Sequence, residues 1–133
     1  MLILSCDRTK KYQSQGIDKA YIDTDTNNYA NILFDDEEMN FGKIKEGEKV
    51  KVIYKFMNSG PSPLIIYDVK LGCGCTSADW RKTPLEVKMR DSLTVIFDST
   101  HKQGKQMKSI VVFYNGYKSK FKVLTLTGII NKI

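Results

Sequence analysis

Two cysteines separated by one glycine are the residues of this sequence best suited to specific chemistry. They lie in Leu71-Gly72-Cys73-Gly74-Cys75-Thr76, and the only tryptophan of the chain, Trp80, follows shortly after. Side chains two apart in an extended strand share a face with Cβ atoms about 6–7 Å apart, whereas a disulfide needs about 3.5–4.5 Å. A turn or bulge at Gly74 would bring the sulfurs together. Such a bridge would close a very small loop, so we expect it to be strained and redox-active rather than a structural staple.

Three interpretations of the pair stay open at this point. In the first, Cys73 is a small buried core residue with Trp80 packed over it, and Cys75 is its neighbour at the strand end. In the second, the pair is a redox-sensitive dithiol of an exported protein. In the third, Cys73 and Cys75 bind Cu(I) or Zn, although two thiolates are too few for a closed zinc site. His101, the only histidine, would join them only if the fold brought its loop over the pair. The first interpretation makes a structural motif of Cys73, Gly74, Cys75, Thr76 and Trp80.

Other catalytic patterns are absent from the sequence. There is no Gly-x-Ser-x-Gly, no glycine-rich phosphate loop and no His-Glu-x-x-His. The acidic run Asp35 to Glu38 lacks the regular spacing of a calcium loop and is typical of a solvated turn. We therefore predict a protein that is not an enzyme and has no cofactor.

The charge of the chain is positive and unevenly distributed. Lys+Arg number 21 against 15 Asp+Glu, giving +6, and no acidic residue follows Asp98. Only three of the basic residues are arginines, the side chain that suits bidentate base and phosphate recognition. We expect a solvated basic surface and no nucleic-acid partner.

The N-terminus resembles the end of a lipoprotein signal. In Met1-Leu-Ile-Leu-Ser-Cys6, the residues Ile3, Leu4 and Ser5 occupy the three positions before a cysteine to be lipidated, although the basic start and most of the apolar core of a signal peptide are missing. A buried N-terminus with an incidental cysteine is the alternative. Residues 7–28 are polar and without periodicity, as a tether would be. We predict a residual signal and tether over residues 1–28, lipidation at Cys6, and one domain over residues 29–133.

Within that domain the chain is typical of strands separated by turns. Asn58-Ser-Gly-Pro-Ser-Pro63 is a strong turn signal, and Asn115-Gly116 is a hairpin signal because both residues tolerate positive φ. Leu64–Leu71 is nearly all apolar and predicts a central strand covered on both faces. The remaining expected strands are Asn31–Phe34, Asn40–Ile44, Val50–Met57, Leu85–Met89, Leu93–Phe97, Ile110–Tyr114 and Phe121–Ile130.

The last of these strands has a problem of phase. Phe121 and Val123 share one face, whereas Leu124, Leu126 and Gly128 share the other. A bulge near Val123 would place both apolar sets in the core. Seven or eight short strands without a helix predict an all-β, immunoglobulin-like antiparallel β-sandwich, with a small closed barrel as the alternative.

Several short motifs together resemble a bacterial family, domain of unknown function 1573. They are Phe41-Gly-Lys-Ile44, Asn58-Ser-Gly60, Pro63-Leu64, Cys73-Gly-Cys-Thr76 with Trp80, Val95-Ile-Phe97-Asp98, Gly104-Lys105 and Leu124-Thr-Leu126-Thr-Gly128. The resemblance covers roughly residues 33–130 and implies an immunoglobulin-like, PapD-like sandwich of exported proteins and lipoproteins with no established activity. One segment departs from the family pattern: where the family has an Ile-x-Pro-Gly turn before the next strand, this chain has Leu85-Glu-Val-Lys-Met-Arg-Asp91.

These observations lead to one functional hypothesis and one alternative. The first is a non-enzymatic, lipid-anchored module of the bacterial envelope, on its periplasmic or surface side, that binds a protein or glycan partner through sheet edges and loops. Its membrane partner is the bilayer that holds the lipid of Cys6. The alternative is a thiol redox or soft-metal protein that acts through Cys73 and Cys75.

Overall fold

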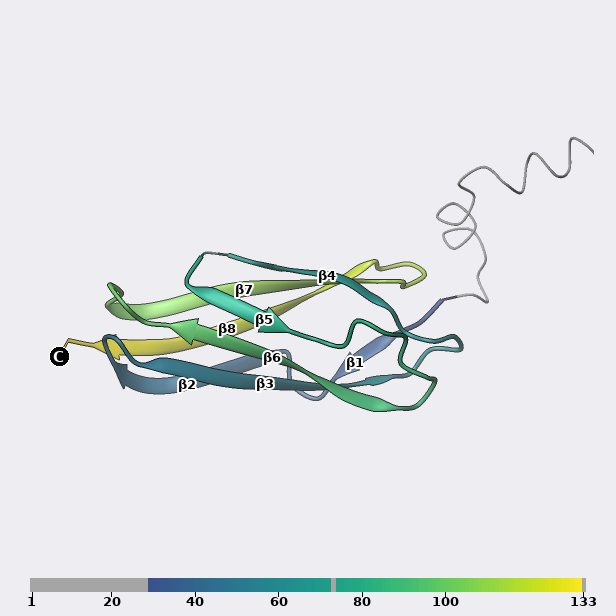
Figure 1. Cartoon of the computed structure of the whole chain (residues 1–133), viewed down its shortest axis with the longest axis horizontal. Helices are drawn as coiled ribbons and strands as arrows, with labels where there is room; N and C mark the ends of the chain where they lie inside the picture. The colour runs from purple at the N-terminus through teal and green to yellow at the C-terminus, as the bar shows by residue number, and fades with distance from the viewer. Residues whose placement is uncertain (1–28, 73, 133) are drawn as a thin grey trace, which may run out of the picture.

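The structure is a computed structural model and describes residues 29–72 and 74–132. Eight strands form two four-stranded sheets that pack face to face (Figure 1). One sheet has the order β1-β3-β6-β5 and the other β2-β8-β7-β4. The strands are β1 Ile32–Phe34, β2 Glu38–Lys45, β3 Lys49–Asn58, β4 Ile66–Leu71, β5 Thr76–Asp79, β6 Arg90–Asp98, β7 Gly104–Tyr114 and β8 Phe121–Asn131. The described part of the chain contains no helix, and the predicted sandwich is confirmed.

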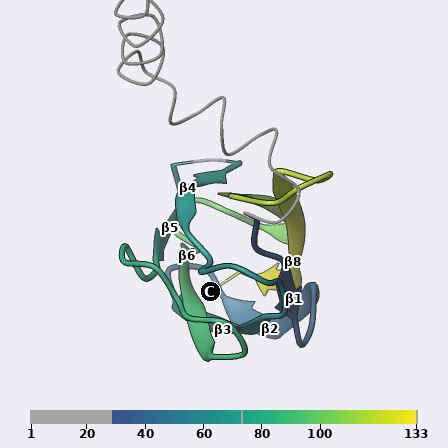
Figure 2. The same ribbon diagram turned by 90° about the vertical axis from the view of Figure 1, so that its right-hand side faces the viewer.

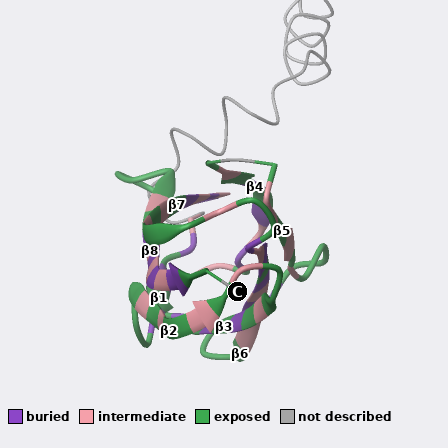
Figure 3. Cartoon of the chain, turned by 90° about the vertical axis from the view of Figure 1, so that its left-hand side faces the viewer, coloured by how far each residue is buried: buried purple, intermediate pink, exposed green. Residues whose placement is uncertain are grey.

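The core fills the space between the sheets. Along β3, Val52, Tyr54 and Phe56 are buried and alternate with exposed lysines, as the period of two requires. End-on views show the two layers and the buried residues that face inward between them (Figures 2 and 3). The Tyr54 hydroxyl crosses the core and donates a hydrogen bond to the carbonyl oxygen of Thr125, 2.8 Å away. Burial raises the pKa of Tyr54 to about 12, so this bond between the sheets keeps its proton at neutral pH.

Two predicted strand positions were wrong. Leu64–Leu71 is not a central strand: β4 begins at Ile66 and lies at the edge of its sheet, with Tyr67, Asp68 and Lys70 exposed. The run is apolar because Leu64 and Ile66 enter the core at the end of the sandwich. Leu85–Met89 is not a strand either, since only Leu85 forms a bridge, to Leu64.

The bulge predicted near Val123 does not exist. Strands β7 and β8 pair without a register shift from Gly104 opposite Ile130 to Phe113 opposite Phe121. Leu124 and Leu126 face the core, and Phe121 and Val123 face solvent. The strand is therefore regular. Its apolar residues switch from one face to the other after Val123 because the outer face is also apolar near the start of β8.

The turns at Gly60 and at Asn115-Gly116 do not have the conformations that the sequence predicted. Neither Asn115 nor Gly116 has positive φ, and six residues separate β7 from β8. Asn115 instead bonds to the start of β4: its side chain accepts from the Ile65 amide at 2.8 Å and donates to the Pro63 carbonyl at 3.0 Å. Gly60 is required for space, because a Cβ there would overlap the backbone of Ala30 and Asn31. The first strand of the domain thus passes directly against the turn at Gly60.

The segment that departs from the family pattern keeps the geometry of that pattern. The amide of Met89 donates to the carbonyl of Glu86 at 3.1 Å, and Lys88 has a φ of 68°. A four-residue turn with positive φ only at its third position is a type II turn, which favours proline second and glycine third. Val87 and Lys88 occupy these two positions, so Lys88 takes a left-handed conformation that suits glycine better.

Restoring the preferred residues of this turn is expected to stabilise the fold. Lys88→Gly removes left-handed strain, and Val87→Pro restricts the unfolded chain, so the double variant should gain about 1–1.5 kcal/mol in free energy of unfolding. Urea denaturation measures the change. Lys88→Ala is the matched control, because it removes the same charge and keeps the strained φ; an equal gain in that variant would contradict the turn explanation.

Candidate functional site

The Leu71–Trp80 segment carries the chain from one sheet to the other. It leaves β4 beside β7, where a Cβ on Gly72 would lie in ordinary contact with the Ser109 carbonyl at 3.7 Å. It enters β5 at Thr76, which pairs with Phe97 of β6. The carbonyl of Cys75 accepts a hydrogen bond from the Asp98 amide at 2.8 Å. The motif is therefore a crossover at the flank of the sandwich, with Gly74 in open space.

Cys75 is half-buried against the core and is disulfide-bonded. The other two cysteines, Cys6 and Cys73, lie outside the described residues, as do the predicted lipidation and the Cys73 half of the predicted metal pair. Within the described residues, no group of three His, Cys, Asp or Glu side chains could hold a metal ion. His101 is exposed in the turn between β6 and β7. The metal prediction thus stays a prediction.

Trp80 lies just beyond β5, half-buried against the core, and its predicted packing over Cys73 lies outside the described residues. The Nζ of Lys82 lies 3.8 Å from the centroid of the Trp80 ring and donates a hydrogen bond to the Trp80 carbonyl at 2.8 Å. The indole Nε1 of Trp80 is buried and has no hydrogen-bond partner among the described residues. Trp80 therefore closes the flank of the sandwich beside the crossover.

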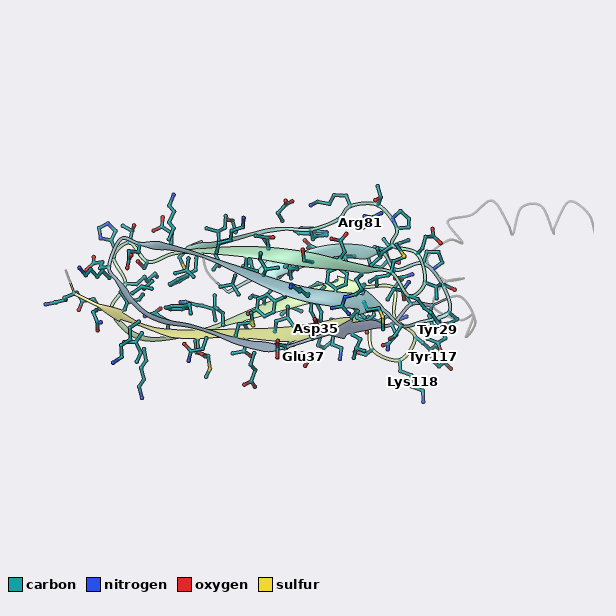
Figure 4. The ribbon with its side chains drawn as sticks, turned by 90° about the horizontal axis from the view of Figure 1, so that it is seen from below. Tyr29, Asp35, Glu37, Arg81, Tyr117 and Lys118 are labelled. Atoms are coloured by element: carbon teal, nitrogen blue, oxygen red, sulfur yellow. The ribbon has the colours of Figure 1, made fainter. Side chains whose placement is uncertain are left out.

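The acidic run Asp35 to Glu38 holds ion pairs with lysine and arginine. Asp35 accepts from Arg90 at 2.6 Å, and Glu37 accepts from Lys122 at 3.2 Å. The hydrogen bond from Arg90 is the main cause that lowers the pKa of Asp35. Both carboxylates lie along the β1–β2 connection (Figure 4), where they tie it to the neighbouring strands β6 and β8.

The outer face of the β2-β8-β7-β4 sheet carries a surface that sequence reasoning missed. Val111 lies directly opposite Val123, and Phe113 lies opposite Phe121, with ring centroids 6.1 Å apart. Phe121 is 49% exposed and Val123 is 45% exposed. We call these four residues the outer-face patch. The signal in the sequence was the phase of β8, which we had attributed to a bulge.

Charged residues lie along the outer face of this sheet, most of the lysines at the end away from the outer-face patch. The Nζ of Lys70 lies 5.7 Å from the Phe113 ring centroid. Further along the same face, Met107 is 75% exposed and helps to line a shallow hollow of about 300 Å³. Lysines outnumber carboxylates on this face among the described strands: Lys43, Lys45, Lys70 and Lys105 against Glu38 and Asp68. Beside the patch itself lie Lys70, opposite Val111, and the carboxylates of Asp68 and Glu38. An apolar centre with a mixed charged border is suited to binding rather than to chemistry.

The opposite sheet shows what an ordinary solvated face of this fold looks like. Its central strand β3 exposes Lys49, Lys51 and Lys55, and the apolar residues Leu33, Ile53 and Ile96 are exposed on the same sheet. One directly paired apolar row lies there, Leu33 opposite Met57, whereas the outer-face patch has two adjacent rows. The two outer faces therefore differ in the extent of paired apolar surface.

Comparison with known proteins agrees with the fold. The family described as "Protein of unknown function (DUF1573)" matches residues 32–130. No curated protein matches the sequence significantly. Within residues 29–72 and 74–132 we find no helix with the length and hydropathy of a membrane span.

Three solved structures illustrate the architecture. A protein of unknown function from Porphyromonas gingivalis W83 is 14% identical, with a TM-score of 0.68 over 79% of this chain and 49% of that one. This chain thus spans about half of that protein. The PapD-like domain 7 of human CEP192 is 11% identical, with a TM-score of 0.58 over 79% of this chain and 88% of that one. The periplasmic chaperone SfaE is 10% identical, with a TM-score of 0.52 over 77% and 58%. At these identities the likeness shows a PapD-like fold.

Proposed function

The chain belongs to the DUF1573 family, and from the surfaces of its own fold we propose that it is an exported, non-enzymatic binding module of the bacterial envelope. Lipid at Cys6 anchors it, residues 7–28 act as a tether, and the outer-face patch binds a protein partner. That partner presents an apolar ridge with polar and charged groups around it. The single observation that carries this proposal is the exposure of Phe121 and Val123 opposite Phe113 and Val111 on one regular pair of strands.

Sheet edges are less suited to the partner than this face. Strand β4 has a register shift between Ile66 and Asp68, and it exposes Asp68 and Lys70. Strand β2, at the other edge of the same sheet, has a register shift between Asn40 and Lys43. Bulges and charges at edges are the devices by which β-proteins avoid adding further strands. We therefore place the partner on the face rather than at an edge.

The binding free energy expected from the patch follows from the apolar area that its side chains would bury. A side chain such as Phe that is half exposed loses about 1 kcal/mol or more of binding free energy when it is truncated, and a direct pair in the centre of an interface loses more. The charges that border the patch, Lys70 against Asp68 and Glu38, nearly cancel, so the apolar contact supplies most of the affinity.

The test compares two double variants of the chain expressed in its own host. Phe121→Ser with Val123→Ser should reduce the partner recovered with the protein from envelope extracts by at least tenfold. The matched control, Leu33→Ser with Ile53→Ser, removes two exposed apolar residues from the opposite sheet and should recover as much partner as the unmodified chain. Equal loss in both, or loss in neither, would refute a specific role of the patch. Self-association of the purified chain that the patch variant abolishes would make a second copy the occupant and would also overturn the proposal.

Lipidation at Cys6 can be tested separately from the outer-face patch. Metabolic labelling with a fatty acid, followed by membrane fractionation, should place the unmodified chain in the lipid-labelled membrane fraction. Cys6→Ser should remove the label and release the protein into the soluble envelope fraction. Label that persists in Cys6→Ser would contradict lipidation at this position, without bearing on the outer-face patch.

A further inference from the structure

The end of the sandwich where β1 begins contains a cleft of about 560 Å³. Three segments form it: the entry to β1, the turn after β3, and the β7–β8 connection. Its lining includes Tyr29, Asn31, Tyr114, Tyr117 and Lys118. In Figure 4, Tyr29, Tyr117 and Lys118 lie together at this end, away from Asp35 and Glu37. The volume falls within the range of pockets that hold small ligands.

The chemistry of the lining is aromatic, polar and positively charged. The rings of Tyr29 and Tyr117 lie 5.3 Å apart at an interplanar angle of 34°, and Tyr117 is 39% exposed. Lys118 forms no ion pair with any described residue, and no carboxylate lines the cleft. The side-chain nitrogen of Asn31 donates a hydrogen bond to the Ser59 hydroxyl at 2.8 Å, which fixes the orientation of the side-chain amide. The side-chain oxygen of Asn31 can then accept a hydrogen bond from a ligand.

Tyr114 adds a hydroxyl to the same cleft, on a ring that is itself buried. The residue is only 2% exposed, and its hydroxyl makes no hydrogen bond to the part of the chain that the structure describes. The β7–β8 connection is held close over its ring, since a Cβ on Gly116 would lie 2.9 Å from a Tyr114 ring carbon. Burial raises the pKa of Tyr114, so the hydroxyl keeps its proton at neutral pH and can donate.

The backbone around the cleft is already paired. The Ala30 amide donates to Asn115, the Ser59 amide to Asn31, and the Ser62 amide to Tyr29, all at 2.8–3.0 Å. The Gly60 amide donates to the Asn58 side chain at 3.0 Å. The entry to β1 and the turn after β3 therefore offer no open ladder to an extended peptide. Recognition has to come from side-chain hydroxyls, an amide and an ammonium group beside aromatic rings, which is the set that suits a sugar ring with its hydroxyl groups.

We propose that this cleft is a binding site for an acidic saccharide, with Tyr117 and Tyr29 against the apolar face of a sugar ring, Tyr114 and Asn31 on its hydroxyl groups, and Lys118 on its carboxylate. The site is separate from the outer-face patch and does not depend on the proposed protein partner. Its ligand class follows from the lysine, the absence of lining carboxylates and the tyrosine rings and hydroxyls that line the cleft.

Amide NMR of the labelled domain tests the site, with tetragalacturonate as the acidic probe and cellotetraose as the neutral one. Tetragalacturonate should shift the amides of residues 29–31, 59–60 and 117–119. Tyr117→Ala should weaken binding about three- to tenfold, and Lys118→Gln should weaken it about fivefold. Lys49→Gln, an exposed lysine of β3, is the matched control and should leave the affinity unchanged. Cellotetraose should bind at least fivefold more weakly than tetragalacturonate.

Several outcomes would overturn the proposal. Absence of shifts with both tetrasaccharides at millimolar concentration would remove the site. Shifts that persist unchanged in Tyr117→Ala and Lys118→Gln would place binding elsewhere. Equal affinity for N-acetyl-tetraglutamate, measured in the same way, would make the cleft an acidic-peptide site. Tyr117→Phe keeps the ring and should keep most of the affinity. If the alanine variant is unstable, this variant tests the site in a folded protein, and a loss as large as that of Tyr117→Ala would contradict stacking.

Discussion

Asn58→Ala is expected to lower the free energy of unfolding by roughly 3–4 kcal/mol, the largest effect of any polar substitution in this domain. Asn58 is fully buried at the end of β3. Its side-chain nitrogen donates to the carbonyls of Ser62 at 2.9 Å and Leu85 at 3.0 Å, and its side-chain oxygen accepts from the Gly60 amide at 3.0 Å.

The cost comes from the groups that the alanine would leave behind. The Leu85 carbonyl retains a second donor, the Leu64 amide at 2.8 Å. The Gly60 amide has no other bond of this kind among the described residues. Each buried group without a partner costs about 1–3 kcal/mol. The backbone of Asn58 also binds both Lys88 and Met89, so this residue joins two loops to the strand.

The chain offers a closely matched control for this prediction. Asn40 accepts the Gly42 amide at 2.7 Å, the same two-residue spacing as Asn58 and Gly60, but it is exposed. Asn40→Ala should cost less than about 1 kcal/mol, because water replaces the lost partner. Urea denaturation of both variants gives the comparison. Similar losses at the two positions would show that local turn geometry, and not burial, determines the effect.

Asn58→Asp adds a test of sign. It keeps the acceptor for Gly60 and places a carboxylate against two carbonyl oxygens, so the folded-state pKa of this aspartate should be raised above its unfolded value of about 3.9. A raised pKa gives stability that is present below the unfolded pKa and is lost as pH rises through the folded pKa. The variant should therefore approach the unmodified protein near pH 4 and fall furthest below it at neutral pH.

Local patterns in the sequence predicted the sandwich well because burial alternates along a strand. Val52, Tyr54 and Phe56 could be assigned to the core from their spacing alone, and the structure buries all three. The position of a strand in its sheet is a different matter, since it depends on partners far away in the chain. Leu64–Leu71 was apolar enough for a central strand, yet its apolar residues close the end of the sandwich and β4 lies at an edge.

The surfaces that we propose for binding were harder to predict than the core. Sequence reasoning assumed that Phe121 and Val123 had to be buried, and so a bulge was inferred where the strand is regular. An exposed apolar row gives the same pattern as a core row, and only the register of β7 against β8 distinguishes them. The tyrosine cleft combines residues near positions 30, 60 and 117, which no short motif connects.

Gly128→Ala is expected to lower the free energy of unfolding by about 2–3 kcal/mol, through an overlap that the family motif at the end of β8 avoids. Gly128 faces the core opposite β2, and a Cβ there would overlap the ring of Phe41. That ring stacks on Phe97, which is fully buried, with centroids 5.4 Å apart and an interplanar angle of 27°. An added methyl group must displace the Phe41 ring from the parallel β2–β8 pair and from Phe97 together.

A double-mutant cycle tests this mechanism directly. Phe41→Ala alone leaves a cavity over Phe97, but it also makes room for the methyl group of Gly128→Ala. In the Phe41→Ala background, Gly128→Ala should therefore cost less than about 0.5 kcal/mol, which gives a coupling free energy of about 2 kcal/mol between the two positions. Gly72→Ala, where a Cβ meets only an ordinary contact at 3.7 Å, is the matched glycine control and should be nearly neutral. Additive losses in the cycle would show that Gly128 is needed for its backbone conformation and not for the space that the Phe41 ring occupies. The contact between the two residues would then not explain why both occur in the motif set of the family.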